Sequence, residues 1–297
     1  MYVTILTPTY NRAGKIVDLY ESLCRQTCKD FKWLVIDDGS MDNTKVFFDE
    51  IKEKTDFEIE YIYKENGGKH TALNEGIQII ETELTFIVDS DDFLVPDAIE
   101  IIISYHKKYQ LDDSLCGYSF LRKFPDGKIN GKKFEPNEKI GTYIEIRVND
   151  NDTQSDKAEV FKTRCLKEYP FPVFEKEKFL GEDIVWTRMA RKYKMVHINE
   201  AIYVGMYQTD GLTHNRRKNN IKSPLGCMNR AKEFTKRDID FRYRLKGTLQ
   251  IIAYGSFAKK KCSEIIKFSE AKWLTIIMFI PGKLLYLLWK MDYEKGK

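Results

Sequence analysis

Three aspartates stand within four residues at Asp89-Ser90-Asp91-Asp92, directly after the apolar run Leu84–Val88. Ionised carboxylates this close repel one another when buried, so they need a cation or hydrogen-bond donors beside them. Mg²⁺ and Mn²⁺ prefer such oxygen ligands and commonly lie between one or two carboxylates and the phosphates of a substrate. The pattern predicts a divalent-metal site at Asp89 and Asp91. The simpler alternative is that one of the last two aspartates caps the helix that Pro96 begins.

Three further polar clusters also follow apolar runs. They are Pro8-Thr9-Tyr10-Asn11-Arg12, Asp37-Asp38-Gly39-Ser40 and Asn66-Gly67-Gly68-Lys69. A carboxylate such as Asp38 can accept hydrogen bonds from a nucleobase or from ribose hydroxyls, and Lys69 offers a charge to phosphate. The paired glycines allow the backbone to approach a ligand closely. Each cluster taken alone is also compatible with an ordinary turn.

The elements that must position these clusters alternate between short apolar runs and longer amphipathic segments. This alternation is typical of βαβ units and a mostly parallel sheet, and it predicts an α/β fold. Functional groups in such sheets gather at the carboxyl ends of the strands, where the four clusters stand. The expected strands are Val3–Thr7, Trp33–Ile36, Ile59–Tyr63 and Leu84–Val88, and the expected helices are Gly14–Gln26, one that follows Asp42, and Lys69–Ile80.

The four clusters, together with Ala72-x-Asn74-x-Gly76, occur in the order and spacing of a known family. Over about the first hundred residues the chain resembles the inverting nucleotide-sugar glycosyltransferases of family two. The resemblance implies a GT-A fold, which is a Rossmann-like domain with a mixed, mostly parallel sheet, and a donor that is usually a UDP-sugar. It also implies Mn²⁺ or Mg²⁺ at Asp89 and Asp91. The residues that it assigns to the nucleotide-sugar are Pro8, Thr9, Tyr10, Asn11, Arg12, Asp38, Gly68, Lys69, Asn74, Asp89 and Ser90. The family's frequent Ala-Arg-Asn reads Ala72-Leu73-Asn74 here, which favours Lys69 as the phosphate contact.

A transferase of this kind needs a base to deprotonate the acceptor hydroxyl. Gly181-Glu182-Asp183 precedes an apolar helical segment and resembles the family's Glu-Asp motif. The resemblance implies that Asp183 is the general base and that Glu182 orients the acceptor or Asp183. The alternative is that both acids lie in a first helical turn, where they complement the macrodipole. His214, in the polar loop 207–214, is a further candidate for the metal or the diphosphate because imidazole suits both.

The charge distribution divides the chain. Residues 1–215 hold 29 Lys and Arg against 38 Asp and Glu, whereas residues 216–297 hold 20 against 7. We expect a GT-A domain at 1–215, with a nucleotide-sugar half at 1–110 and an acceptor half at 111–215. A basic helical tail follows at 216–297. An excess of basic residues of this kind is typical of a segment that meets an anionic partner.

Within the tail, the apolar run Trp273–Trp289 is interrupted by Pro281-Gly282. It is too short and broken to predict a membrane-spanning helix. It favours a position in the membrane interface with both tryptophans at the headgroup level. The alternatives are packing on the catalytic domain or a homo-oligomer interface.

The cysteines, the N-terminus and the first loop limit the cellular location and the class of enzyme that we expect. The six cysteines include no CxxC pair and no signal peptide is visible, so we expect a cytoplasmic protein, peripheral on the inner face of the cell membrane. A dinucleotide oxidoreductase is disfavoured because GxGxxG is absent from the first loop.

The prediction is a metal-dependent hexosyl- or N-acetylhexosaminyl-transferase that acts on a lipid-linked or growing cell-surface polysaccharide, with no nucleic-acid partner. The alternatives are a nucleotidyltransferase, disfavoured because its first loop should be rich in glycine, and a non-catalytic membrane-surface module.

Overall fold

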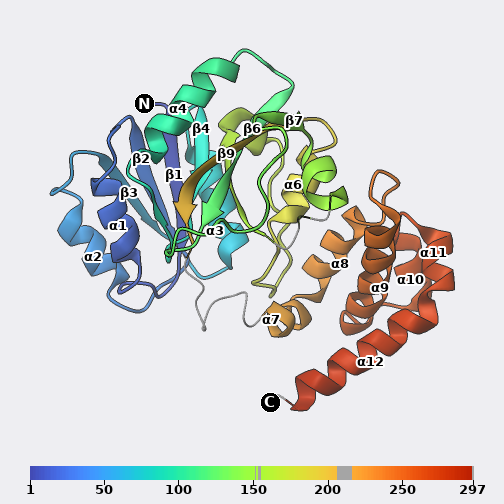
Figure 1. The fold of residues 1–297 in the computed structure, drawn as a ribbon. Coiled ribbons are helices and arrows are strands. Elements are labelled where there is room, and N and C mark those ends of the chain that lie inside the picture. Colours follow the sequence, from blue (N-terminus) through green and yellow to red (C-terminus); the bar gives the residue numbers. More distant parts are fainter. Residues whose placement is uncertain (151, 153–154, 206–215, 296–297) are drawn as a thin grey trace. The chain divides into compact units, whose positions relative to one another are not determined.

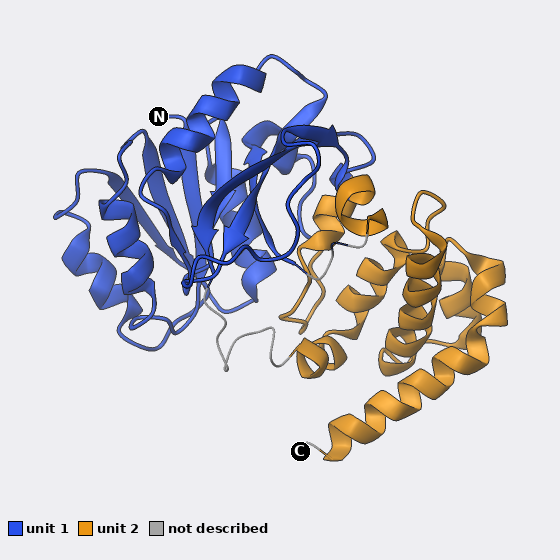
Figure 2. Cartoon of the chain, in the orientation of Figure 1, with its two compact units in different colours: residues 1–143, 152–171, 189–207 blue, residues 144–151, 172–188, 208–297 orange. Residues whose placement is uncertain are grey.

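The computed structural model describes residues 1–150, 152, 155–205 and 216–295. Their contacts form two compact units, which Figure 2 distinguishes by colour and which are described separately here. Unit 1 comprises residues 1–143, 152–171 and 189–207, and unit 2 comprises residues 144–151, 172–188 and 208–297. The segments 144–151 and 172–188 therefore group with the C-terminal helices. The expected domain boundary at residue 215 stays a prediction.

Unit 1 confirms the alternation of strands and helices expected for the first ninety residues (Figure 1). All four predicted strands and three predicted helices are present, with ends shifted by a few residues, as is usual for element boundaries. They are β1 (Val3–Thr9), α1 (Ile16–Cys24), β2 (Phe31–Asp37), α2 (Thr44–Ile51), β3 (Glu58–Tyr63), α3 (Lys69–Ile79) and β4 (Leu84–Ile87). The later elements are β5 (Phe93–Leu94), α4 (Ala98–Tyr109), β6 (Leu115–Lys123), β7 (Lys139–Gly141), β8 (Lys157–Lys162), α5 (Thr163–Lys167) and β9 (Lys194–Val204).

The strands of unit 1 form one mixed sheet in the order β3-β2-β1-β4-β8-β6-β9-β5, with β7 paired to β9. The first four strands in this order are mutually parallel. β8 then pairs antiparallel with both β4 and β6, and β6 is parallel to β9. Since β3, β2, β1 and β4 are parallel neighbours, their carboxyl ends lie at one edge of the sheet, as the sequence predicts.

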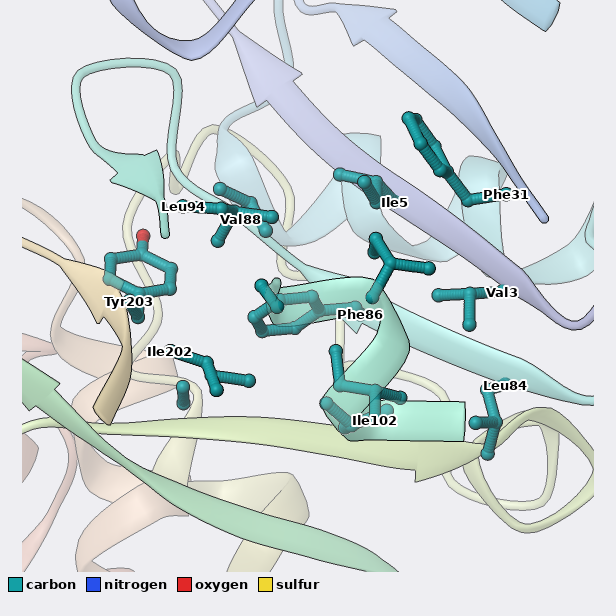
Figure 3. Close-up of a cluster of buried hydrophobic side chains, with 14 of the residues drawn as sticks. Val3, Ile5, Phe31, Leu84, Phe86, Val88, Leu94, Ile102, Ile202 and Tyr203 are labelled. Carbon is teal, nitrogen blue, oxygen red and sulfur yellow. The ribbon is translucent and has the colours of Figure 1, made fainter. Parts of the chain in front are cut away.

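The core of unit 1 lies between the sheet and the helices that cover it. Figure 3 shows Val3 and Ile5 of β1 close to Leu84 and Phe86 of β4, with Ile102 of α4 beside them. The opposite face of β1 carries Leu6, against which α3 packs closely. A Cβ added at Gly76 of α3 would lie only 2.3 Å from Leu6 Cδ1, so glycine permits this contact. The close packing fixes α3, and hence the loop before it, against β1.

Unit 2 is helical apart from its connecting segments. Its elements are the π-helix η1 (Ile144–Asn149), α6 (Asp183–Met189, whose last residue belongs to unit 1), α7 (Arg216–Lys222), α8 (Pro224–Glu233), α9 (Phe241–Phe257), α10 (Cys262–Phe268), α11 (Lys272–Ile277) and α12 (Phe279–Lys295). Met228 and Ala231 of α8 pack with Ile251 and Ile252 of α9 and Ile265 of α10 in a small core. Among the described residues, no helix combines the length and apolar character needed to cross a bilayer.

Candidate functional site

The loops that follow β1 and β2 are hydrogen-bonded to each other. The Asn11 backbone N–H donates to Ser40 Oγ at 2.8 Å, and the Asn11 side-chain oxygen accepts from the Met41 N–H at 2.8 Å. Asn11 has a φ of 51°, a left-handed conformation that asparagine tolerates better than most residues. The structure thus brings together the first two polar clusters that the sequence singles out.

Asp38 connects the second cluster to the third. Its Oδ1 accepts from Lys64 Nζ at 2.8 Å and from the Gly67 N–H at 2.9 Å, and its Oδ2 accepts from the Gly68 N–H at 2.7 Å. Gly68 has a φ of 98°, which L side chains rarely adopt, so glycine is required for this geometry. The buried carboxylate of Asp38 therefore organises the loop that leads into Lys69. Lys64 could not be predicted as part of the site because a lysine at a strand end gives no pattern of its own.

The acidic cluster after β4 is balanced by two cations from the other loops. Lys69 Nζ donates to Asp89 Oδ1 at 2.5 Å, and Arg12 Nη2 lies 3.9 Å from Asp91 Oδ2. Burial opposes ionisation of Asp89, but the charges of Lys69 and Arg122 outweigh it and lower the pKa of this carboxyl. Burial and the neighbouring Asp89 raise the pKa of Asp91. The repulsion between the two carboxylates would be relieved by a cation placed between them.

Asp92 takes part in a buried network instead of capping a helix. α4 begins at Ala98, so the alternative of a cap by Asp91 or Asp92 is wrong. Burial raises the pKa of Tyr203 well above its ordinary value, and its neutral hydroxyl donates to Asp92 Oδ2 at 2.7 Å. The same hydroxyl accepts from the Asp89 N–H at 3.1 Å. The Arg122 guanidinium covers the Tyr203 ring at 3.9 Å. Tyr203 and Arg122 were missed because they lie in β9 and β6, far along the chain from the acidic cluster.

We predict that Tyr203→Phe weakens nucleotide binding. The substitution removes a hydroxyl that fixes the backbone at Asp89 and the side chain at Asp92. Loss of these two buried hydrogen bonds should destabilise the fold by about 1–3 kcal/mol and leave the acidic loop less well positioned. Titration of the variant with UDP and Mn²⁺, beside urea unfolding, measures both effects.

Tyr118→Phe is the matched control for that substitution. Tyr118 is as buried as Tyr203, and its hydroxyl lies 3.0 Å from His106 Nδ1, which is not among the candidate site residues. This control should lose stability but keep the UDP affinity of the parent. Equal UDP affinities for the two variants would refute the positioning role of Tyr203.

The other residues assigned to the nucleotide-sugar occupy different environments. Pro8 lies in β1 opposite Ile36 of β2, and Tyr10 is 45% exposed beyond the strand end. Ser90 is buried. Asn74 lies on α3, where its side-chain amide exchanges two hydrogen bonds of 2.8 Å with the backbone of Phe171. Asn74 therefore holds the chain at Phe171, and its assignment to the donor stays a prediction.

Two buried polar atoms accompany these loops. Within the described residues, Thr9 Oγ1 and His70 Nδ1 are buried without a hydrogen-bond partner. Burial lowers the pKa of His70 despite the nearby Asp38 carboxylate, so the imidazole is neutral at physiological pH. Buried polar groups without partners are uncommon and often mark functional sites.

Asp183, the predicted base, lies in unit 2 in a bidentate ion pair. Arg230 of α8 donates through Nε to Asp183 Oδ1 and through Nη2 to Oδ2. A Cβ added at Gly181 would lie 3.0 Å from Asp183 Oδ1 and 3.2 Å from Arg230 Nε, so glycine leaves room for the pair. The side chain of Asp183 thus has a specific partner beyond the helix macrodipole. Arg230 was missed because a single arginine in a basic segment is indistinguishable from its neighbours.

Further positive charge surrounds this pair. Burial, followed by the charges of Arg230 and Arg216, lowers the pKa of Lys246 on α9. The lowering shows that the three cations lie within electrostatic range of one another. Glu182 precedes α6, and its backbone carbonyl accepts from the Val185 N–H at 2.9 Å. Lys246 therefore lies within electrostatic range of Asp183 as well as of the two arginines.

The part of the chain that the structure describes contains no group of three or more His, Cys, Asp or Glu side chains arranged to hold a metal ion. His214 lies outside the described residues, so its role as a third ligand stays a prediction. Two carboxylates, Asp89 and Asp91, remain as the predicted protein ligands. This small set fits Mg²⁺ or Mn²⁺, which usually complete their coordination with water and substrate phosphates.

The sheet order and the strand-end loops define a GT-A-type fold, and solved structures agree with this fold. TarS from S. aureus, residues 1–349 in complex with UDP-GlcNAc, has a TM-score of 0.61 at 14% identity, with 100% of this chain and 93% of that chain covered. The mannosyltransferase PcManGT from Pyrobaculum calidifontis, in complex with GDP-Man and Mn²⁺, has a TM-score of 0.58 at 17% identity, covering 98% and 83%. Residues 4–160 match glycosyl transferase family 2. The chain belongs to this family, which excludes the nucleotidyltransferase alternative.

Two curated bacterial proteins are also similar to this chain in sequence. Glycosyltransferase GlyA from Streptococcus pneumoniae serotype 4 is 28% identical over 211 residues, which cover 68% of this chain and 30% of that protein. The teichoic acid poly(glycerol phosphate) polymerase from Staphylococcus epidermidis is 29% identical over 149 residues, covering 48% of this chain and 20% of the polymerase. The chain spans about a third of the length of the first curated relatives that it matches.

Proposed function

We propose that the chain transfers a hexosyl or N-acetylhexosaminyl group from a UDP-sugar to an acceptor hydroxyl, with inversion at the anomeric carbon. The observation that carries the proposal is the convergence of four loops at the carboxyl ends of β3, β2, β1 and β4. Hydrogen bonds and ion pairs join these loops through Asn11, Asp38, Lys69 and Asp91. Family membership supports the same activity.

The donor would bind along these loops. Tyr10 and the Asp38 loop would surround the base, and Asp89 with Ser90 would meet the ribose. Arg12 and Lys69 supply two cations for the diphosphate, where charge-assisted hydrogen bonds are strongest. Asp89 and Asp91 would hold Mn²⁺ or Mg²⁺, which supplies positive charge for the departing diphosphate. The unpartnered Thr9 hydroxyl offers a further hydrogen bond at the end of β1.

Asp183 would accept the proton of the acceptor hydroxyl as its oxygen attacks the anomeric carbon. The bond from that carbon to the UDP oxygen breaks, and the negative charge leaves with UDP. Arg230 fixes the orientation of the carboxylate through both oxygens, while each oxygen retains a second lone pair for the proton. Glu182, the preceding residue, would orient the acceptor.

The acceptor class proposed is a lipid-linked or growing cell-surface polysaccharide. The likeness to a teichoic acid polymerase supports a phosphate-containing polymer among these acceptors. Lys246, which lies within electrostatic range of Asp183, favours the same chemistry, since an anionic acceptor group would be attracted to its charge.

A panel of nucleotides tests the proposed donor. The melting temperature of the full chain is measured with UDP, UDP-hexoses, UDP-N-acetylhexosamines, GDP-mannose and ATP, each with Mn²⁺ and with EDTA. A nucleotide at about 100 times its dissociation constant stabilises the fold by about 2.7 kcal/mol, which is readily visible. We expect UDP and its sugars to raise the melting temperature when Mn²⁺ is present. Stabilisation by ATP alone would refute the proposed donor, and so would no response to any nucleotide.

A further inference from the structure

Helix α12 carries two apolar faces, of which one packs within unit 2. Gly282 lies against α9 so closely that an added Cβ would be 2.6 Å from Ile252 Cβ. Farther along the same face, the rings of Tyr286 and Trp289 contact Phe257 and Tyr254 of α9, with ring centroids 4.7 and 5.3 Å apart. Figure 1 shows α12 running beyond the other helices of this unit. Trp289 therefore packs on α9 and is partly buried, and its expected place at the headgroup level stays a prediction.

α11 also carries exposed apolar side chains, and the other face of α12 is exposed. Its side chains recur three or four residues apart, which places them on one side of the helix. Trp273 is 80% exposed and Ile280 is 75% exposed. We call the exposed set the outer apolar face; it consists of Trp273, Ile276, Ile277, Ile280, Leu284, Leu287, Leu288 and Met291. Several exposed apolar side chains gathered on one helix face commonly mark a site of interaction.

The charges around the outer apolar face are mainly positive. Lys283 and Lys290 lie seven residues apart along one flank of the face on α12, and Lys272 begins α11. The two acids of α12 are paired, Asp292 with Arg217 at 3.2 Å and Glu294 with Lys290 at 3.8 Å. The segment 216–297 holds 20 basic residues against 7 acidic ones. A symmetric contact with a second copy would bring these basic surfaces together, whereas an anionic lipid surface complements them.

We propose that the outer apolar face binds the surface of an anionic lipid bilayer, with α11 and α12 lying in the interface. The apolar side chains enter the boundary between headgroups and acyl chains, and the flanking lysines meet lipid phosphates. Trp273, whose indole is amphipathic, takes the headgroup level. This inference goes beyond the proposed function, because it concerns a surface that takes no part in binding the nucleotide-sugar. It fits an enzyme whose acceptor is lipid-linked.

Vesicle sedimentation with the full chain tests the inference. The vesicles are phosphatidylcholine alone or an equal mixture with phosphatidylglycerol. The parent should sediment with the anionic vesicles and much less with phosphatidylcholine, and added salt should weaken the binding. The triple variant Trp273→Ser, Ile280→Ser, Leu284→Ser should bind anionic vesicles at least about ten-fold more weakly, since it removes three large apolar groups from the interface. Lys283→Gln with Lys290→Gln should reduce the preference for the anionic lipid.

The matched control is Leu111→Ser, Val173→Ser, Phe241→Ser, which removes three similarly exposed apolar side chains elsewhere in the chain. This control should bind vesicles like the parent. Equal vesicle binding by both triple variants would overturn the proposal. Absence of vesicle binding by the parent, together with a concentration-dependent dimer that the first triple variant abolishes, would identify a second copy as the occupant. UDP binding, measured in every variant, separates a failure of this inference from a failure of the proposed function.

Discussion

Asp183→Asn should abolish sugar transfer while UDP binding is retained. Asparagine has the shape of aspartate and can still accept a hydrogen bond from Arg230, but its amide cannot take up the acceptor proton. Removing a general base typically slows a reaction by about 10²–10⁴-fold. The effect should fall on the transfer rate because Asp183 belongs to unit 2, while the loops proposed to bind the nucleotide belong to unit 1. Transfer to an acceptor and UDP affinity are measured on the same preparation.

The matched control for Asp183→Asn is Glu233→Gln. Glu233 is a buried carboxylate of unit 2 that also pairs with an arginine, with Arg188 Nε at 3.0 Å. Its loss should lower stability but leave the transfer rate of the folded protein near that of the parent. Normal transfer by Asp183→Asn would exclude Asp183 as the base. Equal losses of transfer in both variants would indicate that the ion pairs of unit 2 matter only for stability.

Asp91→Asn should remove the metal dependence of UDP binding. Burial and the adjacent Asp89 raise the pKa of Asp91, so this carboxylate gains most from a neighbouring cation. With Mn²⁺ present, we expect the UDP dissociation constant to rise at least about ten-fold, which corresponds to about 1.4 kcal/mol. With EDTA, the parent and the variant should bind UDP alike. Isothermal titration of UDP under both conditions provides the comparison.

The control for Asp91→Asn is Asp126→Asn, a change in an exposed turn of unit 1 where the carboxylate lies 3.1 Å from Lys128. It removes one negative charge from the same unit, and it should leave the UDP dissociation constants with Mn²⁺ and with EDTA unchanged. If Asp91→Asn also leaves the Mn²⁺ response intact, the metal site has been assigned to the wrong residues.

The parallel half of the sheet could be predicted from the sequence because its strands and helices are short and strongly patterned. Val3–Thr9 and Phe31–Asp37 are short runs rich in apolar residues and are followed at once by polar loops, which indicates both the strands and the candidate site. The antiparallel strands β8 and β6 carry no comparable pattern. Lys157 and Lys162 stand at the two ends of β8, and their ammonium groups donate to backbone carbonyls of distant segments.

The partners of the site residues could not be predicted, for a related reason. Tyr203 lies 114 residues from Asp89 in the chain, and Arg230 lies 47 residues from Asp183. Side-chain periodicity reports which face of an element is buried, but it carries no information on which distant polar group is met there. The same limit applies to Trp289, whose apolar surroundings suit either a membrane or α9. Only the packing against Tyr254 and Phe257 distinguishes the two faces of α12.

The division of the molecule into two units also determines where the chain can be truncated. Unit 2 is assembled from three stretches of chain, and two of them, 144–151 and 172–188, are interposed between parts of unit 1. A truncation after residue 215, chosen to isolate the expected GT-A domain, would keep these two stretches of unit 2. It would remove the C-terminal helices with which they group. Asp183 would stay with the fragment and Arg230 would leave with the tail. The shortest piece that preserves the proposed catalytic carboxylate in its native pairing therefore extends through α8, well past the end of the sheet.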